Sequence, residues 1–232
     1  MDYIFYCPNI ESEKTFSEQE SIHCAKVLRM KNGDKLTVTD GKGFFYECTL
    51  VNAHPKHCEV DINAKIAHHR AWSFYLQLAF APTKQMNRNE WLLEKATEIG
   101  VNRITPLYSQ FSERKEIKNE RMEKITVSAI KQSKQAHLPT LDEMTTFDSI
   151  ISQPFDGQKF IAHCHNGSKN NLSNSYHKGK NALILIGPEG DFSNEEVEKA
   201  ISHGYIPITL GNNRLRTETA ALTALLSIHI LT

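Results

Sequence analysis

Hydrophobic and polar residues alternate with a period of two in the first 70 residues of the chain. This pattern predicts three strands that each bury one face, at residues 36–39, 44–50 and 60–66. Asp40-Gly41 between the first two strands is a signal for a hairpin turn. Ser17 and Glu20 have the spacing of a capping box, which predicts a short helix that continues to residue 27. We therefore expect a small β-rich domain at the start of the chain.

After residue 70 the pattern changes to an alternation of strands and helices. The expected strands are residues 73–80, 103–108, 159–164, 182–186 and 206–210, and the expected helices are residues 88–99, 120–136, 193–204 and 217–231. The continuous apolar run at 182–186 is typical of a buried parallel strand. Such β–α alternation predicts a mostly parallel sheet with helices on both faces. The segment 168–179, rich in Ser, Asn and Lys, is expected to be an exposed loop.

Composition narrows the classes of protein that fit. The 232 residues include 27 basic and 27 acidic residues, so the formal net charge is zero. This balance argues against a protein that coats nucleic acid by bulk electrostatics. A local basic face is still expected, because residues 84–134 hold 11 basic and 7 acidic residues. The chain is too apolar and too weakly charged for intrinsic disorder.

Cysteine usage and hydropathy indicate the compartment. The five cysteines are scattered and form no CxxC pair, so neither a disulfide framework nor a zinc site is expected. The clusters His68-His69 and His163-Cys164-His165 lack the spacing of metal ligands on a helix. No apolar run approaches the roughly 18 residues of a membrane span, and the first residues lack the pattern of a signal peptide. These features predict a cytoplasmic protein with no metal and no membrane partner.

Two loops carry the residues best suited to chemistry. In an open α/β sheet, ligands bind beyond the carboxyl ends of the strands. Residues 187–193 follow the buried strand with two glycines around Pro188 and Glu189, and glycine lets the backbone approach a ligand closely. Residues 211–218 follow the last strand with two arginines and a glutamate. The alternatives are a tight β–α turn for the first loop and a solvated loop for the second, with Glu218 complementing the helix dipole.

These two loops resemble the signatures of a known family. The run 186–193 (IGPEGDFS), Leu210-Gly211 and the run 215–220 (LRTETA) resemble the RsmE family, SPOUT-superfamily methyltransferases that make 3-methyluridine in 16S ribosomal RNA. Further stretches agree in the same order along the chain: His23 with 27–34, Arg88 with 95–101 and Pro106, and 131–133 before Pro139. The chain departs from the usual family pattern at Asp191, Gln135 and Asn212-Asn213.

The resemblance implies an α/β fold of the SPOUT type with a C-terminal trefoil knot, preceded by a small β-barrel PUA-like domain. The division would be 1–70 for the PUA-like RNA-binding domain and 71–232 for the methyltransferase domain. It also implies S-adenosyl-L-methionine as the cofactor, bound in the knot. The residues expected to hold it are Leu185, Ile186, Gly187, Glu189, Gly190, Leu210, Gly211, Leu215 and Thr217. Homodimers are usual in this superfamily.

The reaction implied by the resemblance is transfer of the sulfonium methyl group to uracil N3. Arg216 is our candidate for stabilising the uracil anion, and Glu189 or Glu218 for accepting the N3 proton. The alternative is that Arg216 and Glu218 pair structurally with each other. Candidates for contacts with 16S rRNA or the small ribosomal subunit are Lys26, Arg29, Lys31, Lys84, Arg88 and Arg114.

Two competing functions fit the same motifs. One is a related knotted methyltransferase with tRNA or another rRNA site as its target. The other is an RNA-binding assembly factor that keeps the fold without activity, and the intact 187–190 and 215–219 motifs argue against it.

Overall fold

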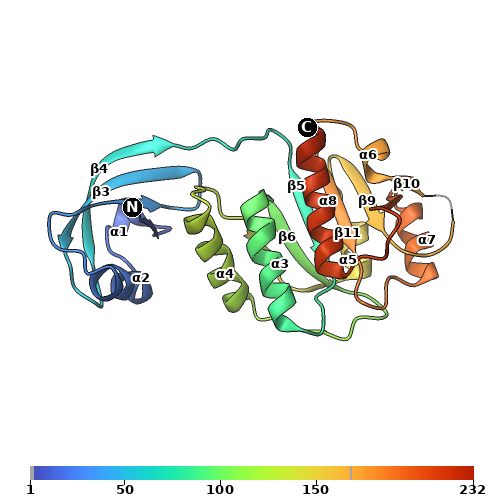
Figure 1. Ribbon diagram of the computed structural model, residues 1–232, viewed down its shortest axis with the longest axis horizontal. Coiled ribbons are helices and arrows are strands. Elements are labelled where there is room, and N and C mark those ends of the chain that lie inside the picture. The colour runs from blue at the N-terminus through green and yellow to red at the C-terminus, as the bar shows by residue number, and fades with distance from the viewer. Residues whose placement is uncertain (1–2, 168) are drawn as a thin grey trace. The chain divides into compact units, whose positions relative to one another are not determined.

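The computed structural model describes residues 3–167 and 169–232, and the chain forms two compact units. The first unit contains Met1–Ala71 together with Val127–Leu138, and the second contains Trp72–Thr126 and Pro139–Thr232. Helix α4 (Asn119–Gln132) therefore contributes residues to both units. Figure 1 labels many of the helices and strands of each.

A four-stranded sheet in the order β1-β2-β3-β4 forms the first unit. Its strands are β1 (Ile4–Tyr6), β2 (Lys35–Thr39), β3 (Phe44–Asn52) and β4 (Glu59–Ala67). The three strands predicted from alternation pair antiparallel, and the short β1, which the pattern did not reveal, pairs parallel to β2. Alternate strand residues such as Val38, Tyr46 and Leu50 are buried and form the core with Phe5.

The helix cap and the hairpin turn predicted for the first unit are both present in the structure. Ser17 caps α2 (Glu18–Ile22) by accepting from the Glu20 amide, and the helical path continues through the π-helical turn η1 (His23–Val27). A single turn, α1 (Ile10–Glu13), precedes them. In the β2–β3 turn, the Asp40 carboxylate accepts from the amides of Lys42 and Phe44, while Gly41 has a positive φ of 74°.

The segment Val127–Leu138 is anchored in the first unit by a largely buried ion pair. Lys131 Nζ lies 2.6 Å from Glu20 Oε1, with side-chain exposures of 19% and 10%. Glu20 Oε2 also accepts from the Tyr6 amide of β1 at 3.3 Å. One carboxylate thus joins α2, β1 and the second half of α4.

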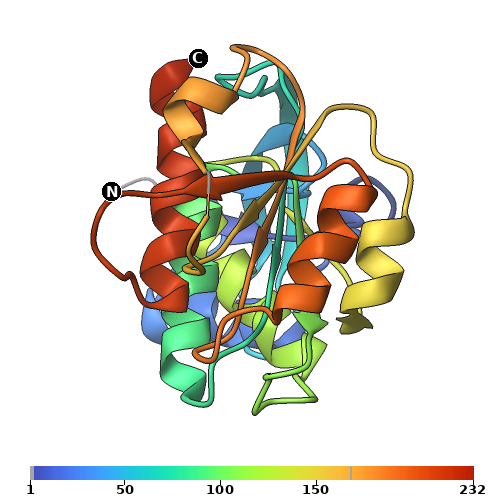
Figure 2. The same cartoon turned by 90° about the vertical axis from the view of Figure 1, so that its right-hand side faces the viewer.

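The second unit is an α/β fold with parallel strand pairing throughout the order β10-β12-β9-β11-β5-β6-β7, and β8 pairs with β6. Its strands are β5 (Leu76–Phe80), β6 (Arg103–Tyr108), β7 (Thr140–Leu141), β8 (Thr145–Thr146), β9 (Gln158–Ala162), β10 (Asn170–Asn171), β11 (Ala182–Ile186) and β12 (Ile206–Thr209). Its helices are α3 (Met86–Ile99), the first part of α4, α5 (Phe147–Ser152), α6 (Leu172–Ser175), α7 (Asn194–Ser202) and α8 (Thr217–Leu231). Helices lie on both faces of the sheet, as the alternation predicts (Figure 2).

The central strand β11 shows how the two faces are sorted. Ile184 and Ile186 pack into the core shared with α3 and α8, whereas Leu183 and Leu185 pack into the core shared with α5 and α7. Because both faces are covered, all five residues of β11 are buried, which accounts for its continuous apolar sequence.

Four sequence-based expectations are wrong in detail. The strands expected over 73–80 and 159–164 are shorter and form at Leu76–Phe80 and Gln158–Ala162. The helix expected over 120–136 ends at Gln132, because Lys134 adopts a left-handed conformation (φ 55°) and the Gln135 amide turns back to the Ile130 carbonyl. The expected exposed loop 168–179 contains β10 and α6, and it buries Leu172 and Tyr176. Ser168 itself lies outside the described residues.

Candidate functional site

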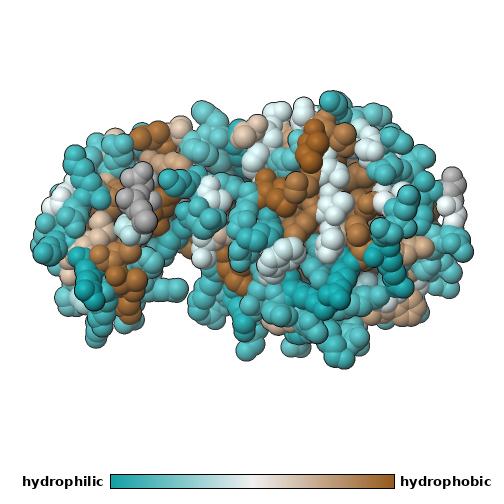
Figure 3. Space-filling view, viewed as in Figure 1, coloured by the Kyte–Doolittle hydropathy of each residue, from teal (hydrophilic) through white to brown (hydrophobic). Residues whose placement is uncertain are grey.

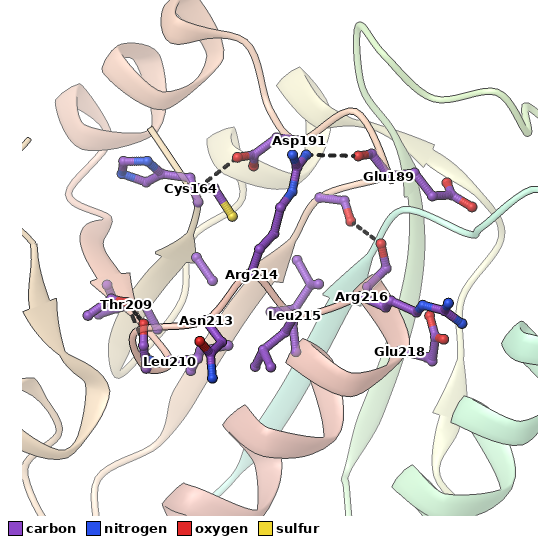
Figure 4. A pocket seen from close by; sticks show the side chains of 18 of the residues that line it. Cys164, Glu189, Asp191, Thr209, Leu210, Asn213, Arg214, Leu215, Arg216 and Glu218 are labelled. Carbon is purple, nitrogen blue, oxygen red and sulfur yellow. Dashed lines mark hydrogen bonds between the residues drawn. The ribbon is translucent and has the colours of Figure 1, made fainter. Parts of the chain in front are cut away.

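A cavity of about 690 Å³ lies in the second unit at the carboxyl ends of β9, β11 and β12. Ligand pockets in proteins usually hold about 300–1,000 Å³, so the space suits a small-molecule ligand. Three loops and the start of α8 surround it, and Figure 4 shows their side chains converging on one space. Its apolar walls come from Ala162, Ile186, Ile208, Leu210 and Leu215.

The loop after β11 is tightly packed at its first glycine. A Cβ on Gly187 would lie 3.2 Å from backbone atoms of Asp191 and Phe192, so the chain folds back closely on itself. Asp191 follows in the left-handed region (φ 68°). Its carboxylate accepts from the amides of Cys164 at 2.7 Å and Phe192 at 2.9 Å. Asp191 therefore joins the loop after β9 to the loop after β11.

The hydrogen bonds of Asp191 and its left-handed backbone conformation both affect the free energy of unfolding, and we expect two substitutions to separate these effects. Asp191→Ala loses both hydrogen bonds and adds left-handed strain, which should lower the free energy of unfolding by about 2 kcal/mol. Asp191→Gly loses the bonds but relieves the strain, so its loss should be nearer to about 1 kcal/mol. Urea unfolding measures both values. A glycine variant less stable than the alanine variant would contradict this account.

The N-terminus of α8 is fixed to the same loop. Thr217 Oγ1 donates to the Gly187 carbonyl at 3.0 Å, and both residues line the cavity. Glu218, the next residue, is only 7% exposed. Its Oε1 lies 3.8 Å from Arg88 Nε of α3, and its buried Oε2 has no hydrogen-bond partner among the described residues. The sequence left open a structural pair between Arg216 and Glu218. In the structure, Glu218 pairs with Arg88.

Glu189 also lines the cavity, but its contacts differ from those of Glu218. It is exposed, and its Oε1 accepts from the Lys84 backbone amide at 3.0 Å. Arg214 donates to the Glu189 carbonyl at 3.4 Å, and Figure 4 shows its side chain crossing the pocket toward this loop. Glu189 thus connects the loop after β11 to the loop after β5.

The loop after β9 supplies a wall that the sequence did not predict. His163 lines the cavity, and neither of its ring nitrogens has a hydrogen-bond partner in the described chain. Burial, followed by the charge of Lys169, lowers the pKa of His163 to about 4, so the ring is neutral at pH 7. Cys164 and Lys169 complete this wall. The sequence signal for this wall is the end of the predicted strand 159–164, which brings His163 and Cys164 to the edge of the sheet where ligands bind.

The predicted cofactor residues divide into two groups. Seven of the nine line the cavity: Ile186, Gly187, Glu189, Leu210, Gly211, Leu215 and Thr217. Leu185 instead points into the core shared with α5 and α7. Gly190 faces Phe111, because a Cβ built there lies 2.9 Å from the Phe111 Cβ. Arg216, a predicted catalytic residue, is exposed at the N-cap of α8 and lines the cavity with Glu218.

The predicted RNA-contact residues lie in different settings. Lys26, Arg29 and Lys31 are exposed in the first unit. Lys84 is exposed and pairs with Glu113, whereas Arg88 is in the cavity and Arg114 donates to the carbonyls of Thr83 and Lys84. Their role in RNA binding stays a prediction.

Much of the basic surplus in residues 84–134 is neutralised within the protein. The segment has four more basic than acidic residues, and three of its basic residues pair with carboxylates outside it: Arg88 with Glu218, Arg103 with Asp142 and Lys131 with Glu20. Four others pair with acids inside the segment: Lys84, Lys95, Arg121 and Lys124. The i, i+4 pair Glu120–Lys124 is among them, as expected from its spacing. A count of charges therefore overstates the basic surface available to RNA.

In residues 3–167 and 169–232, no three His, Cys, Asp or Glu side chains are placed to hold a metal ion. Within the same ranges, every helix is too short or too polar to cross a lipid bilayer.

Comparison with known proteins decides the family. An RNA methyltransferase domain model matches residues 70–229, and an RNA methyltransferase PUA domain model matches residues 16–63. The ribosomal RNA small subunit methyltransferase E of Buchnera aphidicola is 30% identical, over 98% of this chain and 94% of that protein. The chain belongs to the ribosomal RNA small subunit methyltransferase E family. The family member from Bacillus subtilis is 28% identical over 94% of this chain and 91% of its own.

Solved structures agree with membership of this family. A probable rRNA methyltransferase from Porphyromonas gingivalis is 41% identical with a TM-score of 0.94, and the match covers 99% of this chain and 98% of that chain. A putative methyltransferase from Legionella pneumophila, solved with S-adenosylmethionine bound, is 28% identical with a TM-score of 0.88 and the same coverage. The α/β fold and the PUA-like domain implied by the sequence motifs are confirmed by these matches.

Proposed function

We propose that this protein transfers a methyl group from S-adenosyl-L-methionine to N3 of a specific uridine in 16S ribosomal RNA. Its family is named for ribosomal RNA small subunit methyltransferases, and the related Legionella pneumophila protein binds S-adenosylmethionine. The observation that carries the proposal is the cavity where the 187–191 and 211–218 loops meet. The N3 position is the finer part of the proposal and comes from the RsmE resemblance.

The residues around the cavity fit S-adenosyl-L-methionine. Apolar walls from Ile186, Leu210 and Leu215 suit an adenine ring. The ring nitrogens of His163 are buried polar atoms that a ligand with donors and acceptors can satisfy. Asp191 and Glu189 add negative charge that suits a sulfonium and an ammonium group. When bound, this group supplies an electrophilic methyl carbon.

The protein's own residues then position the base and manage charge. Arg216 at the mouth of the cavity orients the uracil and stabilises the negative charge that develops when N3 loses its proton. Glu218 and Glu189 are the carboxylates within the cavity lining that are available to accept this proton. Apolar walls exclude water, which strengthens these electrostatic interactions.

The finer points of the fold belong to the same proposal. We place a trefoil knot in the C-terminal part of the second unit, and the meeting of the loops after β9, β11 and β12 around one cavity supports it. We also propose that the first sheet closes into a small barrel. The Thr15–Glu59 bridge, which pairs β4 with the segment before α2, supports this closure. Along the chain, the PUA-like domain spans 1–70 and the methyltransferase domain 71–232.

The proposed partner is 16S rRNA or the small ribosomal subunit, in the cytoplasm. Lys26, Arg29 and Lys31 of the PUA-like domain and Lys84 and Arg114 of the other domain are the proposed phosphate contacts, which position RNA without reading its sequence. Residues 112–118 carry Arg114 next to the cavity loops.

A homodimer is the proposed assembly, formed through α3 and α8. A helix that is apolar on all sides is normally buried, yet Leu226 and Ile230 of α8 are 40% and 77% exposed. With Trp91 of α3 and Leu222 they line a shallow apolar groove. Figure 3 shows apolar side chains gathered over α8.

Charge placed in this groove should prevent dimer formation. Leu226→Glu is expected to sediment as a monomer in analytical ultracentrifugation at a concentration where the unmodified protein is a dimer, because the carboxylate would be buried unpaired. Ile201→Glu on α7 is the control, since Ile201 is also an exposed apolar residue (45%) but lies outside the groove. A dimeric Leu226→Glu variant would contradict the proposed interface.

The function itself is tested by mass spectrometry of rRNA from a strain that lacks the gene. Loss of 3-methyluridine from 16S RNA, restored by the plasmid-borne gene, is the expected result. Persistence of the modification would exclude this function. Calorimetric titration with S-adenosyl-L-methionine separates the inactive assembly factor, which would not bind it.

A further inference from the structure

Glu189 and Glu218 line the cavity together with Arg216, and the two glutamates differ in burial and in hydrogen bonding. The Glu189 side chain is exposed and already accepts a hydrogen bond from the Lys84 amide. Glu218 is more than nine-tenths buried, and its Oε2 has no partner among the described residues. A buried acceptor without a partner costs free energy, so such an atom in a ligand cavity is best explained by a donor on the ligand.

The position of Glu218 is fixed from two directions. Thr217 Oγ1 is bonded to the Gly187 carbonyl, which sets the start of α8 against the loop after β11. Arg88 approaches from α3 and lies 3.8 Å from Oε1, which leaves Oε2 free. Arg88 is only 28% exposed and lines the cavity, so it is poorly placed for a phosphate of bulk RNA.

We propose that Glu218 Oε2 accepts the N3 proton of the target uracil and that Arg88 is the positioning residue that holds the carboxylate for this step. The inference rests on the proposed methyltransferase function. The N3–H bond breaks, and its proton moves to Oε2. The electron pair left on N3 forms the bond to the methyl carbon. The bond from that carbon to the sulfonium sulfur breaks with its pair kept on sulfur, and Glu218 later releases the proton to water.

Several charged groups surround this carboxylate. Arg88 faces it from α3, and Arg216 lies at the same end of the pocket in Figure 4. Glu189 and Asp191 lie on the loop after β11, with Glu189 bonded to the Lys84 amide and Asp191 bonded to the Cys164 and Phe192 amides. Arg88 is the cation that pairs with Glu218, so its replacement tests the positioning role directly.

The test measures single-turnover methylation of 30S subunits from a strain lacking the gene, between pH 5.5 and 9. Glu218→Gln should lower the rate at pH 7 by about 100-fold or more, since a general base contributes about 10²–10⁴-fold. The loss should become smaller toward pH 9, where hydroxide removes the N3 proton more readily. Arg88→Gln should lower the rate by about tenfold or more, because misplacing a catalytic group is costly. Arg88→Lys keeps the charge and should recover part of the rate.

Matched controls separate this role from folding and from cofactor binding. Glu195→Gln changes a glutamate at the same second helical position, on α7, where it is exposed and outside the cavity, and its rate profile should equal that of the unmodified protein. Calorimetry should show S-adenosyl-L-methionine affinity within about threefold of normal for Glu218→Gln and Arg88→Lys. A Glu218→Gln variant with a normal rate at pH 7 would overturn the inference. Failure of the unmodified protein to methylate the subunits would instead refute the proposed function.

Discussion

Arg216→Ala is expected to lower the single-turnover rate of methylation by about a thousandfold while S-adenosyl-L-methionine affinity stays nearly normal. Removing one preorganised donor to a developing anion typically costs about 10²–10³-fold, and Arg216 is proposed both to stabilise and to orient the uracil. Its side chain is exposed at the N-cap of α8 rather than packed in the core. The fold should therefore tolerate the change.

The measurement is transfer of tritiated methyl groups to 30S subunits, with calorimetry for the cofactor. Arg216→Lys is the informative companion variant, since it keeps the charge but loses the planar guanidinium group. It should fall between the alanine variant and the unmodified protein. Normal turnover by Arg216→Ala would show that another group stabilises the anion.

The second large effect concerns stability. Lys131→Met leaves the Glu20 carboxylate largely buried without its ion partner, and we expect the free energy of unfolding to fall by about 2 kcal/mol. Breaking a fully buried pair costs about 3–5 kcal/mol, and the smaller value allows for the 19% exposure of Lys131. Urea unfolding gives the total, and hydrogen exchange at the Tyr6 amide, which donates to Glu20, gives the local effect.

Two further variants check this interpretation. Lys124→Met, also on α4, removes an exposed pair with Glu120 and should cost about 0.5 kcal/mol or less. The double variant Glu20→Gln/Lys131→Met removes both charges and should recover part of the loss. A double variant whose loss equals the sum of the losses of Glu20→Gln and Lys131→Met would show that the two side chains act independently, so that Lys131 acts through packing.

Elements whose own sequence specifies them were predictable. Strand β11 (Ala182–Ile186) and helix α8 (Thr217–Leu231) have the predicted bounds, and the Ser193–Glu196 capping box starts α7 as expected. In each case the signal lies in neighbouring residues, as a continuous apolar pattern or as a helix cap. The local sequence preference and the tertiary fold therefore favour the same structure.

Elements that exist only through distant contacts were missed. Helix α6 carries one buried apolar residue, Leu172, in a polar segment, so no periodicity marks it. Strand β1 has three residues and forms by parallel pairing with β2, about thirty positions later in the chain. Such pairing depends on the assembled sheet, which sequence periodicity does not describe.

Part of the site was predictable from the sequence, and the part that depends on distant contacts was not. Glycines and charged residues at two strand ends identified the loops after β11 and β12, because these residue types serve ligands wherever parallel strands end. The wall formed by His163, Cys164 and Lys169 was missed, since it is held by a hydrogen bond from Cys164 to Asp191, 27 positions later in the chain. The Arg88–Glu218 pair joins α3 to α8 across 130 residues of sequence and leaves no local pattern.

The division of helix α4 between two units has a consequence during synthesis. Domains generally fold as they leave the ribosome, the N-terminal one first. Here the first 71 residues emerge without Val127–Leu138. Glu20 therefore lacks Lys131 until the segment Trp72–Thr126 of the second unit has also been made. The first unit therefore reaches its complete fold only after residue 138 is available, and a fragment cut near residue 71 would carry a permanently unpaired Glu20.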